Sequence, residues 1–297
     1  MSPNGLVIAG HGRHLMVEDD QGQTVLCHPR GKKNEALVGD RVRWVASGDE
    51  GSIEAIAPRR NVLYRQDEWR TKSFAANLDS VLLMLAAEPE FSETQLSRSL
   101  IACEVAGIEA WIVLNKSDLK TAFDRAWDRL QPYRDMGLKV LPLCLHNDPA
   151  GLSEVAGQLA ARLTLVLGPS GVGKSSLINH FVPEAQALTA EISQALNSGK
   201  HTTTHTRLHW VDRARGTALI DSPGFQSFGL HHIQAADLAS LMPDFKPHLG
   251  ECRFHNCTHL HEPQCGVKEA LAQGRISPNR YRIYEQLMAE LTAPTRW

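Results

Sequence analysis

The chain has 297 residues, with 31 lysines and arginines against 33 aspartates and glutamates, and a formal net charge of −2. This length allows two or three domains, and a net charge near zero excludes a global basic field that would attract nucleic acid. No apolar run reaches membrane-spanning length, and the N-terminus lacks the basic start and apolar core of a signal peptide. Six cysteines without a secretory signal indicate the reducing cytoplasm. We expect a cytoplasmic monomer with no membrane partner.

The first 72 residues predict a small antiparallel barrel. Short candidate strands alternate with turn sequences such as residues 20–22 and 47–49, and five strands in about 70 residues fit an OB-fold. Two basic groups, residues 30–33 and residues 59–65, could contact RNA phosphates or could be a solvated rim of the barrel. The predicted strands cover residues 5–9, 14–18, 24–27, 41–45 and 52–56.

Residues 73–230 alternate strand-like and helix-like segments, which predicts an α/β domain with parallel strands. Residues 78–87 form an almost continuous apolar strand. A capping box at Ser92 opens a helix that should end near Gly107. Further predicted elements are a strand over residues 110–114, a helix over 119–133, a strand over 138–145 and a helix over 152–162.

A candidate base-reading motif, Asn115-Lys116-Ser117-Asp118, follows the strand over residues 110–114. Open α/β sheets bind ligands at this end of a strand. The Asp118 carboxylate can accept from guanine N1–H and the exocyclic amine, whereas adenine has a lone pair in place of N1–H. Asn115 can hold the neighbouring loops, and the stem of Lys116 can cover the ring face. Together with a phosphate loop, this motif predicts a guanine nucleotide.

The phosphate loop follows the short apolar strand over residues 163–167 and precedes a helix. Its glycines let backbone N–H groups surround phosphate oxygens, and the positive end of the helix points at the same place. Lys174 would reach the β- and γ-phosphates as a catalytic residue, and Ser175 would ligate Mg²⁺. The predicted loop consists of Gly168, Pro169, Ser170, Gly171, Val172, Gly173, Lys174, Ser175 and Ser176.

Two further pieces complete the predicted nucleotide site. After the apolar residues 217–220, Asp221 can hold Mg²⁺, usually through water, and the N–H of Gly224 can meet the γ-phosphate. Earlier in the chain, one threonine of residues 202–204 could close over Mg²⁺ when a γ-phosphate is present. We name Thr203 as the representative of these three threonines, because the sequence does not distinguish among them.

The residue that positions the attacking water needs a separate prediction. Many GTPases place a Gln directly after the glycine, but here the position holds Phe225, whose ring cannot orient water by hydrogen bonding. We therefore expect slow intrinsic hydrolysis with His201 orienting the water, because a neutral imidazole can accept a hydrogen bond. Gln226 and His205 are weaker candidates.

Residues 231–297 contain a cluster of candidate metal ligands. Three thiolates and one imidazole suit tetrahedral Zn²⁺ without an open position, which predicts a structural site rather than a catalytic one. Reduced cysteines without a metal are the alternative, and His255 and His261 are rivals for the fourth ligand. The roughly 30 residues around the cluster cannot build much core, so the metal should supply folding energy. A helix over residues 279–291 follows the predicted ligands Cys252, Cys257, His259 and Cys265.

The order of the nucleotide-binding motifs is unusual. In an ordinary small GTPase the phosphate loop comes first, whereas here the motif at residues 115–118 comes first. The same sheet can form if the old termini are joined and the chain is cut elsewhere. This arrangement resembles the circularly permuted GTPases. With the cysteine-histidine pattern and the stretch over residues 30–42, nearly the whole chain is similar to the ribosome-small-subunit-dependent GTPase family (RsgA/YjeQ).

The resemblance implies three parts: an OB-fold over residues 1–72 that contacts RNA, a permuted GTPase domain over 73–230, and a zinc-binding, α-rich module over 231–297. It implies a GTPase that binds the small (30S) ribosomal subunit and its 16S rRNA in late maturation, with subunit-stimulated hydrolysis to GDP and phosphate. It selects His259 as the fourth zinc ligand and also points to His201. The sequence Cys144-Leu-His-Asn147 departs from the Ser-Ala that GTPases usually have there, so a base contact from this loop stays open.

Two other functions remain to be compared with this one. The chain could be an RNA-binding module that uses GTP only as a switch, with negligible hydrolysis. It could also be a P-loop kinase for a small molecule, but the motif at residues 115–118 and the threonines at 202–204 argue against that function.

Overall fold

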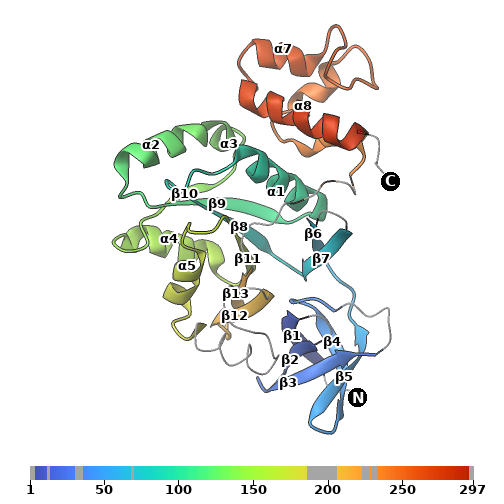
Figure 1. Cartoon of the computed structure of the whole chain (residues 1–297), viewed down its shortest axis with the longest axis vertical. Helices are drawn as coiled ribbons and strands as arrows, with labels where there is room; N and C mark the ends of the chain where they lie inside the picture. Colours follow the sequence, from blue (N-terminus) through green and yellow to red (C-terminus); the bar gives the residue numbers. More distant parts are fainter. Residues whose placement is uncertain are drawn as a thin grey trace.

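The computed structural model describes residues 4–11, 14–30, 36–67, 70–185, 206–222, 228, 230 and 233–293. Three units follow one another along these residues: a five-stranded barrel, an α/β unit and a C-terminal helical unit (Figure 1). The helices of the described residues are too short or too polar to cross a bilayer.

The barrel closes in the order β1-β2-β3-β5-β4, with β4 returning to pair with β1. This order is that of a five-stranded Greek-key barrel of the OB type. Along β4, Val42 and Trp44 are buried while Arg41 and Arg43 are exposed, the alternation expected of a strand with one face on a core. All five predicted strands are confirmed. They are β1 (Asn4–His11), β2 (His14–Asp19), β3 (Thr24–Pro29), β4 (Arg41–Ser47) and β5 (Glu50–Ile56).

A separate hairpin follows the barrel and was not predicted from the sequence. It consists of β6 (Val62–Asp67) and β7 (Arg70–Ala76), which pair antiparallel with each other. The predicted domain boundary at residue 72 falls inside β7, and it stays a prediction, as does the boundary at residue 230.

The α/β unit contains a sheet in which five neighbouring strands are parallel. The strands run in the order β10-β9-β8-β11-β13, and β12 pairs antiparallel with β13 at their edge. All residues of β8 are buried, because β8 is central and both its faces are covered. The strands are β8 (Ser80–Ala86), β9 (Glu109–Asn115), β10 (Val140–Pro142), β11 (Leu163–Leu167), β12 (Thr206–Asp212) and β13 (Thr217–Asp221).

Helices cover both faces of this sheet (Figure 1). One face packs against α1, α2 and α3, and the other packs against α4 and α5. Alternate residues of β8 serve the two cores, with Leu83 on the first side and Met84 on the second. The helices are α1 (Glu93–Ala106), α2 (Lys120–Arg129), α3 (Gln131–Asp135), α4 (Pro149–Leu159) and α5 (Lys174–Phe181).

The predicted cap of α1 is confirmed, since the Ser92 side chain accepts from Gln95 N and Gly107 has a left-handed φ of 63°. The predicted helix over residues 119–133 was wrong in its continuity. It divides into α2 and α3, and Pro132 lies in the first turn of α3, where a missing N–H costs least. The strand predicted over residues 138–145 shortens to β10, and α4 starts earlier than predicted because the Asp148 side chain caps it.

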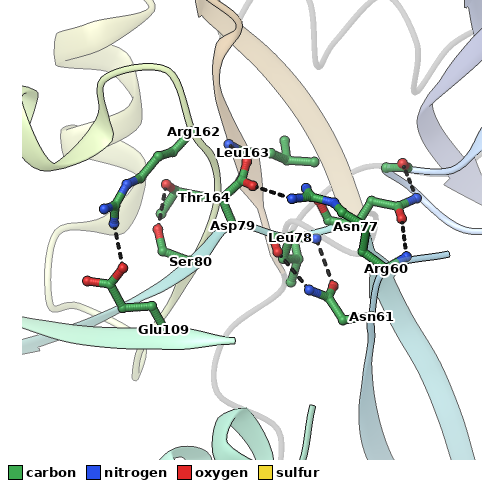
Figure 2. A network of polar contacts seen from close by, with 11 residues as sticks. Arg60, Asn61, Asn77, Leu78, Asp79, Ser80, Glu109, Arg162, Leu163 and Thr164 are labelled. Atoms are coloured by element: carbon green, nitrogen blue, oxygen red, sulfur yellow. Dashed lines mark hydrogen bonds and ion pairs between the residues drawn. The ribbon is translucent and has the colours of Figure 1, made fainter. Parts of the chain in front are cut away.

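A polar network joins the end of the barrel to the start of the parallel strands (Figure 2). Arg60 donates to Asp79 Oδ1 at 2.8 Å, and the other oxygen of Asp79 accepts from Leu163 N at 2.7 Å. Asn61 exchanges two hydrogen bonds with the backbone of Leu78. Arg59 pairs in addition with the buried Asp40. Both arginines, which the sequence offered as RNA contacts, therefore make structural ion pairs.

The C-terminal unit packs on α1 through a buried arginine. Arg280 is 2% exposed, donates to both oxygens of Asp244 at 2.8 and 2.9 Å, and donates to Ser97 Oγ of α1 at 2.7 Å. Arg98 of α1 pairs with Glu290. The predicted helix over residues 279–291 is confirmed as α8. The unit comprises 3₁₀ turns η1 (Ala235–Leu241) and η2 (Lys246–Glu251) and helices α7 (Gly266–Ala272) and α8 (Pro278–Thr292).

Candidate active site and metal centre

The phosphate loop connects β11 to α5, in the centre of the parallel strands. Gly173 has φ 104°, a conformation that residues with a Cβ rarely adopt. At Gly168 a Cβ would lie 2.1 Å from the carbonyl oxygen of Met84 in the neighbouring strand. Glycine is therefore required at both ends of the loop. The loop leads into α5, whose first-turn N–H groups have no partner within the helix and can meet an anion.

Lys174 lies inside this loop and is only 9% exposed. Its ammonium group donates to the carbonyl oxygens of Gly168 and Pro169 at 2.8 and 2.7 Å. Burial lowers the pKa of Lys174, while the nearby carboxylate of Asp221 acts in the opposite direction. These contacts hold a positive charge at the place where a bound phosphate chain would lie.

Asp221 ends β13, the strand beside the phosphate-loop strand. Burial raises the pKa of Asp221 to about 6, although the N–H of Ser222 and the ammonium of Lys174 lower it. Ser222 donates its hydroxyl to the carbonyl oxygen of Val166 at 2.9 Å, which fixes the chain just after the carboxylate. At neutral pH the carboxylate is therefore ionised, and it is close enough to Lys174 for each charge to shift the pKa of the other group.

Asn115 connects three loops at the end of β9. Its amide nitrogen donates to the carbonyl oxygen of Val172 in the phosphate loop at 2.8 Å, and its amide oxygen accepts from Leu145 N at 3.3 Å. The side chain is buried. A Cβ at Gly173 would come within 2.7 Å of the Asn115 amide nitrogen. The phosphate loop, the base motif and the loop after β10 are therefore held together before any ligand binds.

Asp118 and Lys116 lie on the outer side of this junction. Lys116 has φ 65°, and its ammonium group donates to the carbonyl oxygen of Glu88 at 2.6 Å. Ser117 N donates to Leu143 O at 3.1 Å. Asp118 Oδ1 accepts from the Cys144 thiol at 3.4 Å. The loop after β10, whose base contact the sequence left open, therefore lies beside the predicted base reader.

The sequence left the involvement of Cys144 and Leu145 open, because their residue types depart from the Ser-Ala that GTPases usually have there. Their position was nevertheless available, since the loop follows the strand that neighbours β9. In the parallel pair, Leu141 lies opposite Val113 and Pro142 opposite Leu114. Both strands therefore end at the same edge of the sheet, next to each other.

One sheet edge collects all the described pieces of the predicted site. The strands β9, β8, β11 and β13 are parallel neighbours, so the base motif, the phosphate loop and Asp221 meet at their carboxyl ends. Since adjacent strands are about 4.8 Å apart, β9 and β11 are separated by about 10 Å, close to the distance from a purine to its phosphates. The predicted residues His201, Thr203 and Gly224, with Phe225, Gln226 and His205, lie outside the described residues.

The cysteines of the C-terminal unit form a compact cluster with His259. The ligand atoms of Cys252, Cys257, His259 and Cys265 all lie within 4.8 Å of one another, and the cluster can hold a metal ion. His259 Nδ1 lies 3.5 Å from Cys252 Sγ and 3.4 Å from Cys265 Sγ. Burial raises the pKa of Cys257 to about 12, and the neighbouring thiol of Cys265 contributes. A cation is therefore needed if several of these groups are to be thiolates.

The loop that carries these side chains is fixed by hydrogen bonds from its surroundings. Tyr281 and Tyr284 of α8 donate their hydroxyls to the carbonyl oxygens of His259 and Thr258, each at 2.7 Å. The Glu262 carboxylate accepts from the N–H and the hydroxyl of Thr258. The imidazole of His259, rather than that of His255 or His261, faces the sulfur atoms. These contacts orient the ligand set from outside, as outer groups do in metal sites.

The strand order β12-β13-β11-β8-β9-β10, with a phosphate loop after β11 and an Asn-x-x-Asp motif after β9, defines a P-loop GTPase of permuted chain order. Residues 56–231 match the family model described as RsgA GTPase. The chain is 62% identical over 294 residues to the small ribosomal subunit biogenesis GTPase RsgA of Variovorax paradoxus (strain S110), covering 97% of this chain and 92% of that protein. The chain therefore belongs to the RsgA GTPase family.

Solved structures agree with this assignment. YjeQ from Thermotoga maritima superposes with a TM-score of 0.75 at 28% identity, and the match covers 99% of this chain and 100% of that one. YloQ, described as a circularly permuted GTPase, superposes with a TM-score of 0.73 at 28% identity, over 100% of this chain and 98% of that one. The predicted fold class, a permuted GTPase domain with an N-terminal barrel and a C-terminal cysteine-histidine module, is confirmed.

The pKa of Asp221 leads to a pH prediction for GTP turnover. The predicted role of Asp221 at Mg²⁺ needs an ionised carboxylate, so kcat/KM should fall about tenfold per pH unit below about pH 6. Unfolding is not the cause of this expected loss of activity. Because burial raises the folded pKa above the unfolded value of 3.8, the folded chain binds the proton first, and this titration stabilises the fold as pH falls from 6 to 4.

The measurement is kcat/KM for GTP from pH 5 to pH 8 at saturating Mg²⁺, with circular dichroism at each pH. Asp221→Asn is the matched control, because an amide of the same shape does not titrate; its low activity should lack the step near pH 6. A parent profile that stays flat down to pH 5 would contradict the assignment of Asp221.

Proposed function

We propose that the chain is a GTPase of small ribosomal subunit biogenesis, which binds the 30S subunit and its 16S rRNA late in maturation and hydrolyses GTP to GDP and phosphate. The observation that carries the proposal is the junction at Asn115, which ties the phosphate loop to the guanine-type motif. The names of relatives that align over nearly the whole chain supply the ribosomal partner. Family membership argues against the small-molecule kinase.

In this proposal the guanine base lies between the Lys116 stem and the loop after β10, with Asp118 accepting from N1–H and the exocyclic amine. The N–H groups from Gly168 to Ser176 surround the phosphates, and Lys174 exchanges its two carbonyl partners for β- and γ-oxygens. Neutralising the charge that develops on these oxygens is the main contribution of the site.

Magnesium fits the oxygen groups on this sheet edge, since the hydroxyl of Ser175 follows Lys174 and the ionised Asp221 lies on the neighbouring strand. Ser175 and Asp221 would hold Mg²⁺, with Thr203 as the additional ligand that the sequence predicts, and the bound ion would neutralise negative charge on the phosphates. Gly224 would donate its N–H to the γ-phosphate. His201 remains the proposed water-orienting residue, on the sequence argument alone.

Zinc is the proposed metal of the C-terminal cluster. A tetrahedral Zn²⁺ with Zn–S of about 2.3 Å and Zn–N of about 2.0 Å separates two sulfurs by about 3.8 Å and a sulfur from a nitrogen by about 3.5 Å. Cys252 Sγ and Cys265 Sγ are 3.9 Å apart, and the two sulfur–Nδ1 distances are 3.5 and 3.4 Å. Four protein ligands leave no open position, so the site would be structural.

The barrel is the proposed RNA-binding surface. Arg41 and Arg43 point outward from β4, on alternate positions to the buried Val42 and Trp44. They replace Arg59 and Arg60 as the candidate phosphate contacts on the described part of the barrel, because those two arginines are engaged with Asp40 and Asp79. Local arginines suit a chain whose net charge is close to zero.

The test of the proposed function is GTP turnover with and without purified small ribosomal subunits. Subunits should raise the rate by about tenfold or more, because a partner must complete a site that lacks the usual glutamine. Lys174→Ala should lose about 10²-fold of the stimulated rate. His201→Ala should lose a similar factor in kcat with little change in KM.

Competition by ATP in place of GTP is the specificity control, and ATP should not displace the nucleotide. Tight GTP binding without phosphate release in the presence of subunits would instead support the non-enzymatic switch.

Metal removal gives a second prediction. Chelation or Cys257→Ser should unfold the C-terminal unit, because a structural zinc contributes on the order of 10 kcal/mol of binding free energy to folding. Elemental analysis should find one zinc per chain in the parent and in the matched control Cys144→Ser, which lies outside the cluster, and none in Cys257→Ser. A Cys257→Ser variant that keeps both its zinc and its melting curve would refute the site.

A further inference from the structure

The barrel and the nucleotide-binding sheet are continuous through β12. Strand β1 of the barrel pairs antiparallel with β12, and β12 pairs antiparallel with β13 (Figure 1). One row of this ladder contains Ala9 of β1, Arg207 of β12 and Asp221 of β13, each opposite the next. The backbone of the barrel is therefore two strands away from Asp221, whose carboxylate interacts electrostatically with Lys174.

A buried ion pair reinforces this junction. Glu18 of β2 is 7% exposed, and its two carboxylate oxygens each accept from Arg213 at 2.7 Å. The indole N–H of Trp210, on β12, lies 3.1 and 3.2 Å from the same oxygens. The Arg213 guanidinium lies 5.1 Å from the centre of the Trp210 ring. One carboxylate of the barrel thus holds both the end of β12 and the turn after it.

This ion pair constrains the orientation of the barrel against β12 more than it adds to the free energy of unfolding. Burying a carboxylate costs desolvation free energy, which a charge pair recovers only with good geometry, such as the parallel two-bond contact seen here. The ladder between β1 and β12 sets the register of the two strands, and an apolar contact of equal area at Glu18 would add no directional constraint to it. Three directed hydrogen-bond donors on one carboxylate allow a single orientation.

A second ion pair between the two units lies at the other end of the parallel strands. Arg60 and Asp79 join them at the start of β8 and β11, the edge of the parallel strands opposite the phosphate loop (Figure 2). That link reaches β11 at Leu163, which lies opposite Ala218 of β13, at the other end of β13 from Asp221. The barrel has further contacts at the start of β8, where Asn77 donates to the carbonyl oxygen of Gly39 at 2.9 Å and Ala76 N donates to that of Val38 at 3.0 Å. The contact at β12 differs from these because its row of the ladder contains Asp221.

We propose that Glu18 is a positioning residue for GTP hydrolysis. It holds β12 through Trp210 and the turn after β12 through Arg213, and β12 in turn positions Asp221. Contact of the barrel with RNA displaces β12 relative to β11 and changes the geometry at the phosphate edge. Because coupling between two binding sites is reciprocal, the bound nucleotide changes the RNA affinity of the barrel by the same factor. This inference rests on the proposed function for its RNA partner.

The first test compares Glu18→Gln with Arg60→Gln, a matched control that removes the other inter-unit ion pair. The affinity for small ribosomal subunits is measured with a non-hydrolysable GTP analogue and with GDP, and turnover is measured with and without subunits. In Glu18→Gln the ratio of the two affinities and the stimulation of turnover should both shrink about five- to tenfold. Arg60→Gln should retain both. Equal behaviour of the two variants, or an unchanged ratio in Glu18→Gln, would overturn the proposal.

The second test needs no ribosome. Amide hydrogen exchange of the free chain is compared between the GTP analogue and GDP, with β1 and β2 as the readout. Protection there should depend on the nucleotide in the parent and lose that dependence in Glu18→Gln. If Glu18→Gln does not fold, Trp210→Phe keeps the ring, removes the N–H and should reduce the same difference.

The two tests separate the inference from the proposed function. Absence of nucleotide binding would be a failure of the proposed function. If nucleotides bind but the amide exchange of β1 and β2 is the same for both, only the positioning role is contradicted. The same conclusion follows if Glu18→Gln keeps the full difference in exchange between the two nucleotides.

Discussion

The amide of Asn115 is the contact on which the arrangement of the site depends. It donates to the phosphate loop at Val172 and accepts from the loop after β10 at Leu145, so one buried side chain sets the relative positions of three segments. The surrounding glycines allow this approach, since a Cβ at Gly173 would collide with the amide. The site is therefore organised by the protein alone, and a nucleotide binding there has little ordering cost among these segments.

The parallel sheet explains why a permuted chain can still build this site. Ligand-binding residues lie at strand ends, and their positions depend on which strands are neighbours rather than on which comes first in the chain. Here α4 connects β10 to β11, which joins the segment after the last base-contact strand to the phosphate-loop strand. The cut lies elsewhere, and it allows the barrel to precede β8 and the cysteine-histidine unit to follow β13.

Polar contacts join the three units to one another. The barrel is linked by Glu18 with Arg213 and by Arg60 with Asp79, and the C-terminal unit is linked by Arg280 with Ser97. Such pairs need correct geometry to recover their desolvation cost, so they favour one relative orientation of the units. Apolar packing also joins the barrel to the sheet, because one core contains Leu6, Ile8 and Met16 of the barrel together with residues of the α1–α3 face of the sheet. The other side of the barrel, the α4–α5 face and the C-terminal unit each have a core of their own.

The sequence alone predicted the residues of the phosphate loop, the motif at 115–118, Asp221 and the metal cluster. Each is a local pattern whose spacing reflects its own chemistry. The barrel strands could be predicted for the same reason, since the alternation of buried and exposed residues and the turn sequences are local patterns. The tertiary structure alone decided that β12 joins the barrel to the sheet, that Cys144 contacts Asp118, and that Arg59 and Arg60 are engaged in ion pairs. Each of these depends on a partner far away in the chain, and residue type and spacing do not specify which distant group a side chain will meet.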